Sequence, residues 1–480
     1  MVYSAHKTWY HFASFHGRNL QNLAKKDSQV TPQKPDNQNQ LFQPRLEPIL
    51  NDRHPLYKLA ASIDWQAMDK ELCCCYSEDM GRPGNATRLM VGLHYLKHAY
   101  NESDESLIER WVENPYWQYF CGYEHMEHKF PIDPSSMSRW RHRVGPERME
   151  ILLKETFSTA VREKYVKPSD ASKIIVDTTV QEKAVAFPTD ARLYLKSIHR
   201  LVKLARQRNI NLRQSYVRVS KKAFFNQGRY ARAKRYKQAA RLTKKLKTYL
   251  GRLIRDIERK IDNPDQMLAT MLERTKRIHS QQRNDSNKLY SLDAPEVECI
   301  SKGKAHKRYE FGCKVSLSVT HKNNWITSSA ALHGNPFDGK TLSATIERSQ
   351  SNTNIEVKQA YVDLGFRGHD YVGDAAIYKQ DGKLKQLTRA IRNKIKRRSA
   401  IEPTIGHVKS DNRMGRNYLK GADGDQINAI LAAAGYNMRK LIAAFLYALM
   451  ESAGFLENWL NETARNPLPY RAGTANLMAK

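Results

Sequence analysis

Cysteine is scarce in this sequence, with six residues in 480. No CxxC pair meets a second such pair, or an HxxxH pair, at the spacing of a zinc site. A chain of this length would also need more cysteines for a disulfide framework. We therefore expect reduced, buried or incidental thiols in a cytosolic protein, namely Cys73, Cys74, Cys75, Cys121, Cys299 and Cys313.

Long apolar runs are missing as well. No charged segment followed by an apolar core opens the chain, as a signal peptide would require. The most apolar late stretch is LIAAFLYALM at 441–450, which is too short to span a bilayer and directly follows Arg439 and Lys440. This stretch predicts a core helix, and we expect a cytoplasmic protein that does not contact a membrane.

Acidic residues are few relative to basic ones, with 49 Asp and Glu against 80 Lys and Arg, and the formal net charge is +31. A surplus of this size favours a polyanionic partner, above all nucleic acid, because basic side chains that neutralise phosphates release condensed counterions. The alternative is a soluble protein that is merely basic.

The pattern of residues divides the chain into four segments. Residues 1–40 are polar and predict a disordered tail, and residues 451–480 form a C-terminal tail. Residues 41–165 predict short helices, with Ser103 as one cap and either Asp133 or Ser135 as another. The last of these helices carries Arg139, Arg141 and Arg143, which suggests a helix-turn-helix-like DNA-binding domain. A small helical bundle with a basic surface is the alternative.

Residues 166–450 predict an α/β domain with one central sheet. Runs typical of strands occur at 173–180, 309–321, 325–332 and 358–366, with a weaker one at 376–380, and a helical region follows. A helical insertion at 196–288 interrupts this domain. The insertion carries 27 Lys and Arg against 6 Asp and Glu, a surplus of 21.

The second half of the insertion has leucine and isoleucine residues at intervals of three or four, which predicts a long amphipathic helix in a helical hairpin. The concentration of charge favours contact with the DNA backbone, and Lys244, Lys245 and Lys247 are candidate contacts. The alternative is that these charges form a solvated face.

Three acidic residues are candidates for chemistry. Asp177 ends the apolar run IIV, Asp363 ends the similar run AYV, and Glu402 lies on the later helix among cations. Carboxylates that meet at one edge of a sheet suit Mg²⁺ or Mn²⁺. Two such ions orient the nucleophile and stabilise the leaving oxygen in phosphoryl transfer.

Ordinary roles are open for each acid. An aspartate at the end of a strand is more often a turn or cap residue than a ligand. Glu402 could form an ion pair with Arg398, four residues earlier on a helix. Asp338 and Asp370 compete for the site, although their glycine-rich surroundings favour turns.

Several motifs, taken together and in order, resemble the bacterial transposases of the insertion-sequence-five type. They are VDTTVQEKAVAFPTDARLY, APEVECISKGKAHKRYEFGCKVS, HGNPFDGKTL, AYVDLGFRGHD and RRSAIEPTIGHVKSDNRMGRNYLKG, with further matches from about residue 41. The resemblance implies an RNase H-like catalytic domain, a mixed sheet flanked by helices, with an Asp-Asp-Glu triad at Asp177, Asp363 and Glu402. It also implies two Mg²⁺ or Mn²⁺ ions, and DNA contacts by Arg398 and Lys409. Ile395 stands where that family's motif has a tyrosine, and Leu364 stands where relatives usually carry a basic residue.

The resemblance further implies the reaction. Water attacks the phosphodiester at each transposon end, and the exposed 3′-hydroxyl then attacks target DNA. The N-terminal helices would recognise terminal inverted repeats, the insertion would clamp flanking DNA, and the protein would act as a homodimer on DNA near the nucleoid. Two alternatives remain, a DNA-binding protein that does not cleave and a nuclease that cuts without strand transfer.

Overall fold

The structure is a computed structural model of the whole chain, and it describes residues 29–30, 44–76, 82–301, 308–379 and 388–452. The predicted tail at 1–40 lies outside the described residues except for a two-residue strand. Most of the predicted tail at 451–480 lies outside them as well. The two-residue strand, β1 (Gln29–Val30), pairs in parallel with β2 (Arg82–Pro83).

The N-terminal part is helical, as predicted. Its helices are α1 (Pro55–Ser62), α2 (Trp65–Leu72), α3 (Thr87–Ala99), α4 (Asp104–Glu113), α5 (Pro115–Phe120) and α6 (Pro134–Arg162), with a 3₁₀ turn η2 (Cys73–Cys75). Ser103 and Asp133 cap α4 and α6, because the Ser103 hydroxyl accepts from Ser106 N and the Asp133 carboxylate accepts from Ser135 N. The cap at Ser103 is confirmed, and of the two candidates for the later helix the cap is Asp133 and not Ser135.

The long helix α6 bends at Gly145, whose φ of 73° lies in the left-handed region that glycine tolerates. The predicted short basic helix is therefore the part of α6 before this bend, and a second helical part follows from Pro146.

The central sheet is mixed. Its strands are β3 (Lys173–Glu182), β4 (Glu298–Ile300), β5 (Glu310–Thr320), β6 (Ile326–Leu332), β7 (Gln359–Val362) and β8 (Ala376–Lys379). β3 lies between β5, to which it is antiparallel, and β7, to which it is parallel, and β7 continues in parallel to β8. β4 and β6 both pair with the far edge of β5. The five predicted strands are confirmed, and β4 was not predicted.

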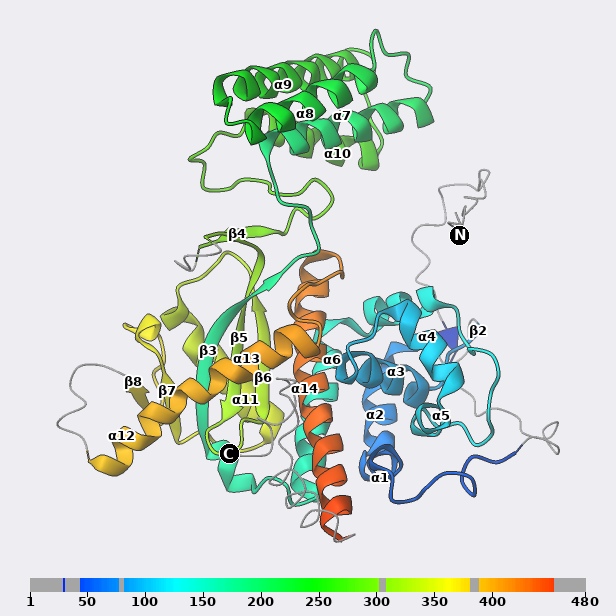
Figure 1. Cartoon of the computed structure of the whole chain (residues 1–480), viewed down its shortest axis with the longest axis vertical. Helices are drawn as coiled ribbons and strands as arrows, with labels where there is room; N and C mark the ends of the chain where they lie inside the picture. Colours follow the sequence, from blue (N-terminus) through cyan, green and yellow to red (C-terminus); the bar gives the residue numbers. More distant parts are fainter. Residues whose placement is uncertain (1–28, 31–43, 77–81, 302–307, 380–387, 453–480) are drawn as a thin grey trace, which may run out of the picture.

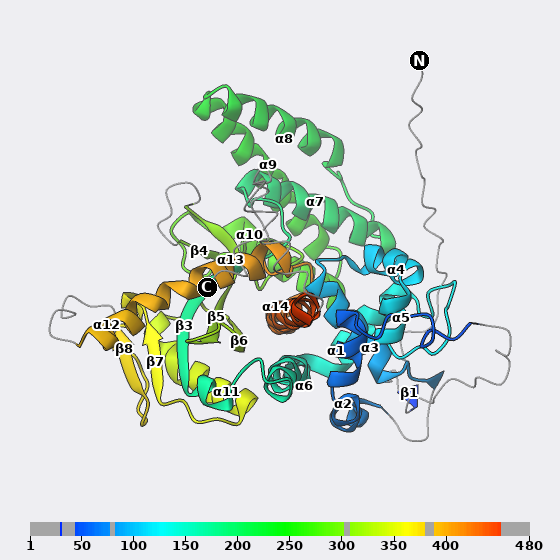
Figure 2. The ribbon, with the colours of Figure 1, turned by 60° about the horizontal axis from the view of Figure 1, so that its bottom comes forward.

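Helices cover both faces of the sheet (Figure 2). The face with Ile175 and Tyr361 shares one hydrophobic core with α12 (Arg389–Lys396), α13 (Ile401–Asp411), α14 (Gly421–Ser452) and the N-terminal helices. The opposite face, with Ile174 and Val362, packs against α11 (Leu342–Thr353) in a smaller core. Short 3₁₀ turns join these elements, namely η3 (Pro168–Ser172), η4 (Asp338–Thr341), η5 (Leu364–Phe366) and η7 (Arg397–Ala400).

Helix α14 lies between the sheet and the N-terminal helices, where it packs against α6, α3 and β6 (Figures 1 and 2). Among the described residues, only the stretch Gly421–Met450 of this helix is long and apolar enough to cross a bilayer. Of its apolar window, 67% is buried inside the protein. The predicted core helix at 441–450 is the last part of this helix, where Leu441 and Phe445 are buried but Leu446 and Tyr447 are exposed.

The basic insertion consists of four helices, α7 (Asp190–Gln207), α8 (Val217–Arg232), α9 (Tyr236–Glu258) and α10 (Gln266–Ser280). They enclose a hydrophobic core of their own, which includes Leu246, Leu250 and Leu253 of α9. Figure 1 shows this unit set apart from the sheet and from the N-terminal helices. The predicted amphipathic helix is confirmed as α9, which forms a helical hairpin with α8 inside the four-helix unit.

Candidate active site at the edge of the sheet

Asp177 lies in the middle of the central strand β3, where almost every neighbouring side chain is buried. Its Oδ1 accepts a hydrogen bond from Thr178 N at 2.7 Å. The side chain of Asp177 is 17% exposed, so the carboxylate is accessible from one side. A partly buried carboxylate at this position needs a cation or hydrogen-bond donors to offset its lost hydration.

Asp363 follows β7, the parallel neighbour of β3. The last register pair between the two strands is Ile175 with Tyr361, and Asp177 and Asp363 each come two residues after it. Side chains alternate between the faces of a sheet, which assigns Asp177 to the face of Ile175. Asp363 has an extended backbone and caps η5, where its Oδ1 accepts from Gly365 N at 2.9 Å.

Glu402 belongs to the first turn of α13, the helix that crosses β3 on this same face (Figure 1). Its side chain is 63% exposed. Arg398 lies one helical turn earlier, and its guanidinium contacts both acids: Nη1 is 3.5 Å from Asp177 Oδ2 and Nη2 is 3.4 Å from Glu402 Oε1. The ion pair with Glu402 that the sequence allowed is therefore present, and Asp177 shares the same cation.

Lys409 lies on α13 seven residues after Glu402, which returns it to the same side of the helix. Beyond α13, the loop at 412–420 carries further cations that the sequence reasoning did not select. The exposed ring of Tyr418 has the guanidinium of Arg413 within 6.0 Å and that of Arg416 within 5.7 Å.

Asp338 is a fourth acid near this edge, and it points toward the sheet. Its Oδ1 lies 3.0 Å from Lys314 Nζ and accepts from the Thr178 hydroxyl at 3.0 Å. A Cβ added to Gly365 would lie 3.0 Å from Asp363 Oδ1 and 3.1 Å from Asp338 Oδ2. Glycine therefore leaves the space in which the two carboxylates approach each other. Asp370 does not form the turn expected from sequence, because its Oδ1 accepts from Ser343 N in the first turn of α11 at 3.1 Å.

The three arginines selected on α6 differ in their surroundings. Arg139 is exposed and donates to the Ser136 hydroxyl. Arg143 is half-buried over the ring of Tyr76. Arg141 is buried and donates to Asp104 at 2.9 Å, so its positive charge is paired inside the protein. This corrects the expectation that Arg141 contacts DNA.

Asp104 also pairs with Lys97 at 2.7 Å. Burial alone would raise the pKa of Asp104, but Lys97 and Arg141 together lower that pKa well below its usual range. The N-terminal helices share their core with the sheet and α14, so this ion-pair cluster lies inside the main body of the protein.

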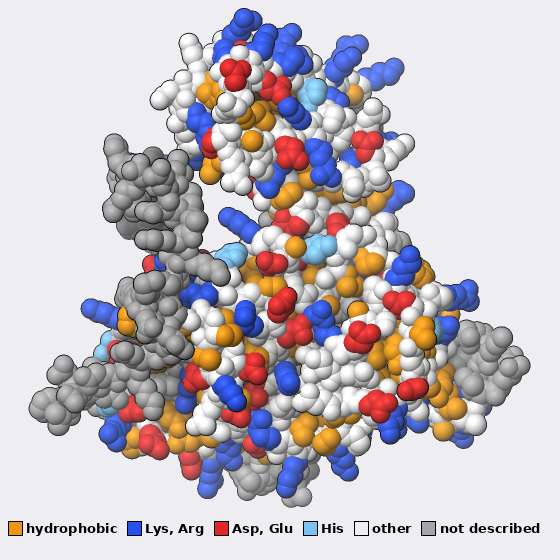
Figure 3. Space-filling view, turned by 180° about the vertical axis from the view of Figure 1, so that it is seen from behind, with side chains coloured by type: hydrophobic (Ala, Val, Ile, Leu, Met, Phe, Trp, Pro, Cys, Tyr) orange, Lys and Arg blue, Asp and Glu red, His pale blue; other side chains and the backbone are white. Residues whose placement is uncertain are grey.

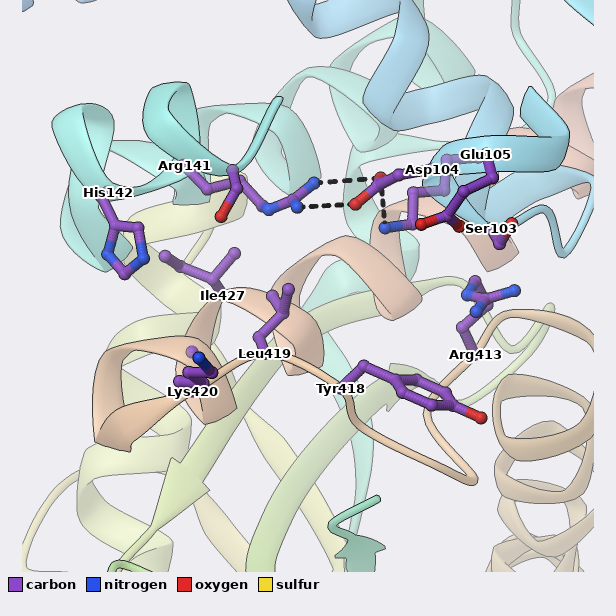
Figure 4. Close-up of a pocket in the computed structure, with 13 residues that line it drawn as sticks. Ser103, Asp104, Glu105, Arg141, His142, Arg413, Tyr418, Leu419, Lys420 and Ile427 are labelled. Carbon is purple, nitrogen blue, oxygen red and sulfur yellow. Dashed lines mark hydrogen bonds and ion pairs between the residues drawn. The ribbon is translucent and has the colours of Figure 1, made fainter. Parts of the chain in front are cut away.

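A cavity of about 610 Å³ lies beside this cluster, between the N-terminal helices and the loop at 412–420 (Figure 4). Asp104, Arg141 and Lys97 line one wall, and Arg413, Tyr418 and Lys420 line another. None of Asp177, Asp363 and Glu402 lines it. The cavity is therefore separate from the carboxylate edge, and the ionic groups on its inner wall are paired with each other.

The three lysines selected in the insertion lie on α9. Lys244 and Lys245 are exposed and Lys247 is half-buried. Figure 3 shows blue Lys and Arg side chains gathered over the upper end of this four-helix unit.

Comparison with known proteins identifies two matching families. Residues 44–143 match the family described as Transposase domain (DUF772), and residues 344–442 match the family described as Transposase DDE domain. The second match includes Asp363, Arg398 and Glu402. The chain therefore contains two transposase domains, of which the second is a DDE domain.

A curated relative of the chain comes from Rhizobium meliloti and carries the name "Uncharacterized protein ORF8 in nfe locus". The two sequences are 49% identical over 208 residues, which is 43% of this chain and 100% of the relative. No solved structure matches the chain.

Proposed function

We propose that the chain is a transposase of the insertion-sequence-five type that cuts transposon ends and joins them to target DNA. The observation that carries this proposal is the pairing of Arg398 with both Asp177 and Glu402, beside the strand β7 that Asp363 follows. Asp177 lies within β3, and Asp363 directly follows β7, the parallel neighbour of β3. These three acids are the proposed catalytic triad.

The order of strands supports an RNase H-like domain. When β3, β5, β6, β7 and β8 are numbered 1 to 5 and the short β4 is left out, their order across the sheet is 3-2-1-4-5. Only strand 2, which is β5, is antiparallel to its neighbours, β3 and β6. Helices cover both faces, as the mixed α/β fold implied by the resemblance requires. The first acid lies on the central strand, the second ends the adjacent strand, and the third comes from a helix that crosses them.

The residues fit a pair of hard divalent cations. All three proposed ligands are carboxylates, the donors that Mg²⁺ and Mn²⁺ prefer. Asp177 already has a cation, Arg398, within 3.5 Å, which indicates that the site tolerates positive charge. When bound, two such ions orient an attacking hydroxyl or water and stabilise the leaving oxygen of the phosphodiester.

The surrounding cations of this chain would bind and orient the DNA strand. Arg398 can turn from the carboxylates to a phosphate, to which a guanidinium donates in a bidentate manner. Lys409 lies farther along the same side of α13 and would contact the next part of the backbone. Arg413, Arg416 and Tyr418 extend this basic surface along the following loop.

More distant parts of the chain would hold the DNA on either side of the cut. Arg139 belongs to the N-terminal helices, to which we assign recognition of the terminal inverted repeats. Lys244, Lys245 and Lys247 would contact flanking phosphates from the insertion. Because two transposon ends must be joined in one event, we propose a homodimer assembled on DNA at the bacterial nucleoid.

The test is to incubate the protein with Mg²⁺ and DNA that carries the element's end sequence. Joined products are expected. Nicked DNA without joined products would instead indicate a nuclease, and binding without nicking would indicate a DNA-binding protein.

The variant Asp363→Ala should abolish nicking and retain DNA binding. Asp374→Ala is a matched control, since it removes an exposed acid from the same segment. If Asp363→Ala cuts as fast as the unmodified protein, the proposed triad is wrong.

A further inference from the structure

A second group of potential metal ligands lies on the sheet away from the carboxylate edge. It consists of Cys313 on β5, His333 in the turn after β6, and Asp425 in the first turns of α14. One ligand atom from each residue lies within 4.8 Å of the others. On β5, Cys313 is four residues from Leu317, the register partner of Asp177, so about 13 Å separate this group from the proposed triad.

Each of the three side chains is oriented by a second group. Asp425 Oδ1 accepts hydrogen bonds from Lys183 Nζ at 2.8 Å and from Asn417 Nδ2 at 2.6 Å. Its other oxygen, Oδ2, is 3.8 Å from His333 Nε2. Donors to one carboxylate oxygen thus leave the other oxygen directed at the imidazole.

His333 and Cys313 are held in a similar way. Glu298 Oε1 lies 3.8 Å from His333 Nδ1, the ring nitrogen on the far side from Asp425. Gln181 Nε2 lies 3.7 Å from Cys313 Sγ. Carboxylate partners behind a histidine, and donors to a thiolate or a carboxylate, are typical of the shell that surrounds metal ligands.

Among the described residues, three carboxylates and one lysine lie around this group. Asp425, Glu296 and Glu298 bring three carboxylates, with side chains 3%, 11% and 23% exposed. Lys183 pairs with two of them, Asp425 and Glu296, each at 2.8 Å. Oε2 of Glu298 is buried and has no hydrogen-bond partner. Buried negative charge in excess of positive charge is costly unless a cation offsets it.

We propose that Cys313, His333 and Asp425 bind one Zn²⁺ ion, with Glu298 orienting His333 from behind. The donor set of sulfur, nitrogen and oxygen suits zinc, whereas Mg²⁺ prefers oxygen ligands alone. The observed separation of 3.8 Å between His333 Nε2 and Asp425 Oδ2 is close to that of two ligands on one tetrahedral ion, about 3.5 Å.

This site would have a structural role. Its ligands come from β5, from the turn after β6 and from α14, and the orienting Glu298 comes from β4. Lys183 and Glu296 lie where the chain leaves the sheet for the basic insertion and where it returns. A bound ion would therefore fix the part of the sheet from which the insertion extends.

Cobalt spectroscopy tests the thiolate ligand directly. The reduced full-length protein, freed of metal by a chelator, is titrated with Co²⁺, and we expect one equivalent to bind with a sulfur-to-cobalt charge-transfer band. Cys313→Ser should abolish the band, and His333→Ala should weaken Zn²⁺ binding at least tenfold. Cys299→Ser, which removes a nearby thiol of β4, should keep both properties.

Three results would overturn the proposal: no Co²⁺ binding by the unmodified protein, a charge-transfer band that persists in Cys313→Ser, or a band that is lost in Cys299→Ser. Circular dichroism of each variant checks the fold. Asp363→Ala should bind Zn²⁺ normally, so failure of the zinc site is distinguished from failure of the proposed triad.

Discussion

Arg398 of η7 and Asp177 of the central strand β3 form an ion pair, with Nη1 and Oδ2 3.5 Å apart. The same guanidinium reaches Glu402 through Nη2. One cation thus neutralises two acids that would otherwise repel each other. A bound divalent ion and Arg398 would compete for these two carboxylates.

This competition gives opposite effects on metal binding and on catalysis. For Arg398→Gln we expect Mn²⁺ affinity to rise about fivefold, since an ion pair of this kind contributes up to ~1 kcal/mol. DNA cleavage should fall about tenfold or more, because a phosphate contact is lost. Electron paramagnetic resonance measures Mn²⁺ binding, and an end-cleavage assay at saturating Mn²⁺ measures the rate. Lys396→Gln removes an exposed positive charge two residues away and should change neither quantity. Weaker Mn²⁺ binding by Arg398→Gln would contradict the competition.

A substitution at Gly365 tests whether the space between Asp363 and Asp338 is needed for activity. In Gly365→Ala the new Cβ would meet both carboxylates at about 3 Å and would displace them. We expect end cleavage to fall at least tenfold, with stability changed by less than about 1 kcal/mol because the residue is not in the core. Gly406→Ala on α13 is the control, since a Cβ there meets no atom within 4 Å. Full activity of Gly365→Ala would show that the position of Asp363 tolerates this crowding.

The basic insertion gives a prediction that depends on salt. Reversing Lys244, Lys245 and Lys247 to Glu should weaken DNA binding and lower the slope of log affinity against log salt by up to about 3, since each phosphate contact contributes ~0.9. Fluorescence anisotropy at several NaCl concentrations measures this slope. A control triple reversal at Lys164, Lys322 and Lys358, exposed positions outside the insertion, should have a smaller effect. Equal effects of the two triple variants would favour a solvated face for the insertion.

Asp104 gives a prediction about pH. Its pKa is lowered in the folded protein, so its contribution to stability is present above its unfolded pKa of about 4 and is lost as pH falls toward the lowered value. Asp104→Asn leaves Arg141 buried without its charged partner and should cost about 3 kcal/mol at pH 7. Urea unfolding measures the difference in the free energy of unfolding between Asp104→Asn and the unmodified protein. This difference should be constant from pH 7 to pH 5 and smaller at pH 3.

Glu105→Gln is the matched control for Asp104→Asn, because Glu105 is exposed in the same first turn of α4. It should change stability by less than about 0.5 kcal/mol. A difference between Asp104→Asn and the unmodified protein that grows as the pH is lowered would be inconsistent with the depressed pKa.

Local patterns predicted much of the fold. The strands around Asp177 and Asp363 are runs of β-branched and apolar residues, and Ser103 and Asp133 have the chemistry of helix caps. The short β4 has too few residues for a pattern of its own, and its place depends on pairing with β5. Local sequence also could not show that the N-terminal helices and the sheet share one core, because α14, which joins them, comes far later in the chain.

The side-chain partners that the sequence could not reveal are all distant along the chain. Arg141 looked like a surface cation, but Asp104, from another helix, pairs with it in the interior. Cys313 had no neighbouring ligand at zinc spacing, whereas folding brings His333 and Asp425 to it. Asp338 looked like a turn residue, and only the sheet shows that Lys314 and Thr178 hold its carboxylate.

The ion pair between Lys183 and Glu296 joins the point where the chain leaves the sheet to the point where it returns. Because the two ends of the basic four-helix unit meet in space and the unit has its own core, a short turn could replace it without altering how the strands pair. Evolution could therefore enlarge, exchange or discard this unit while the carboxylate edge stays the same. Proteins with different versions of this unit could therefore differ in DNA affinity and still catalyse the same reaction.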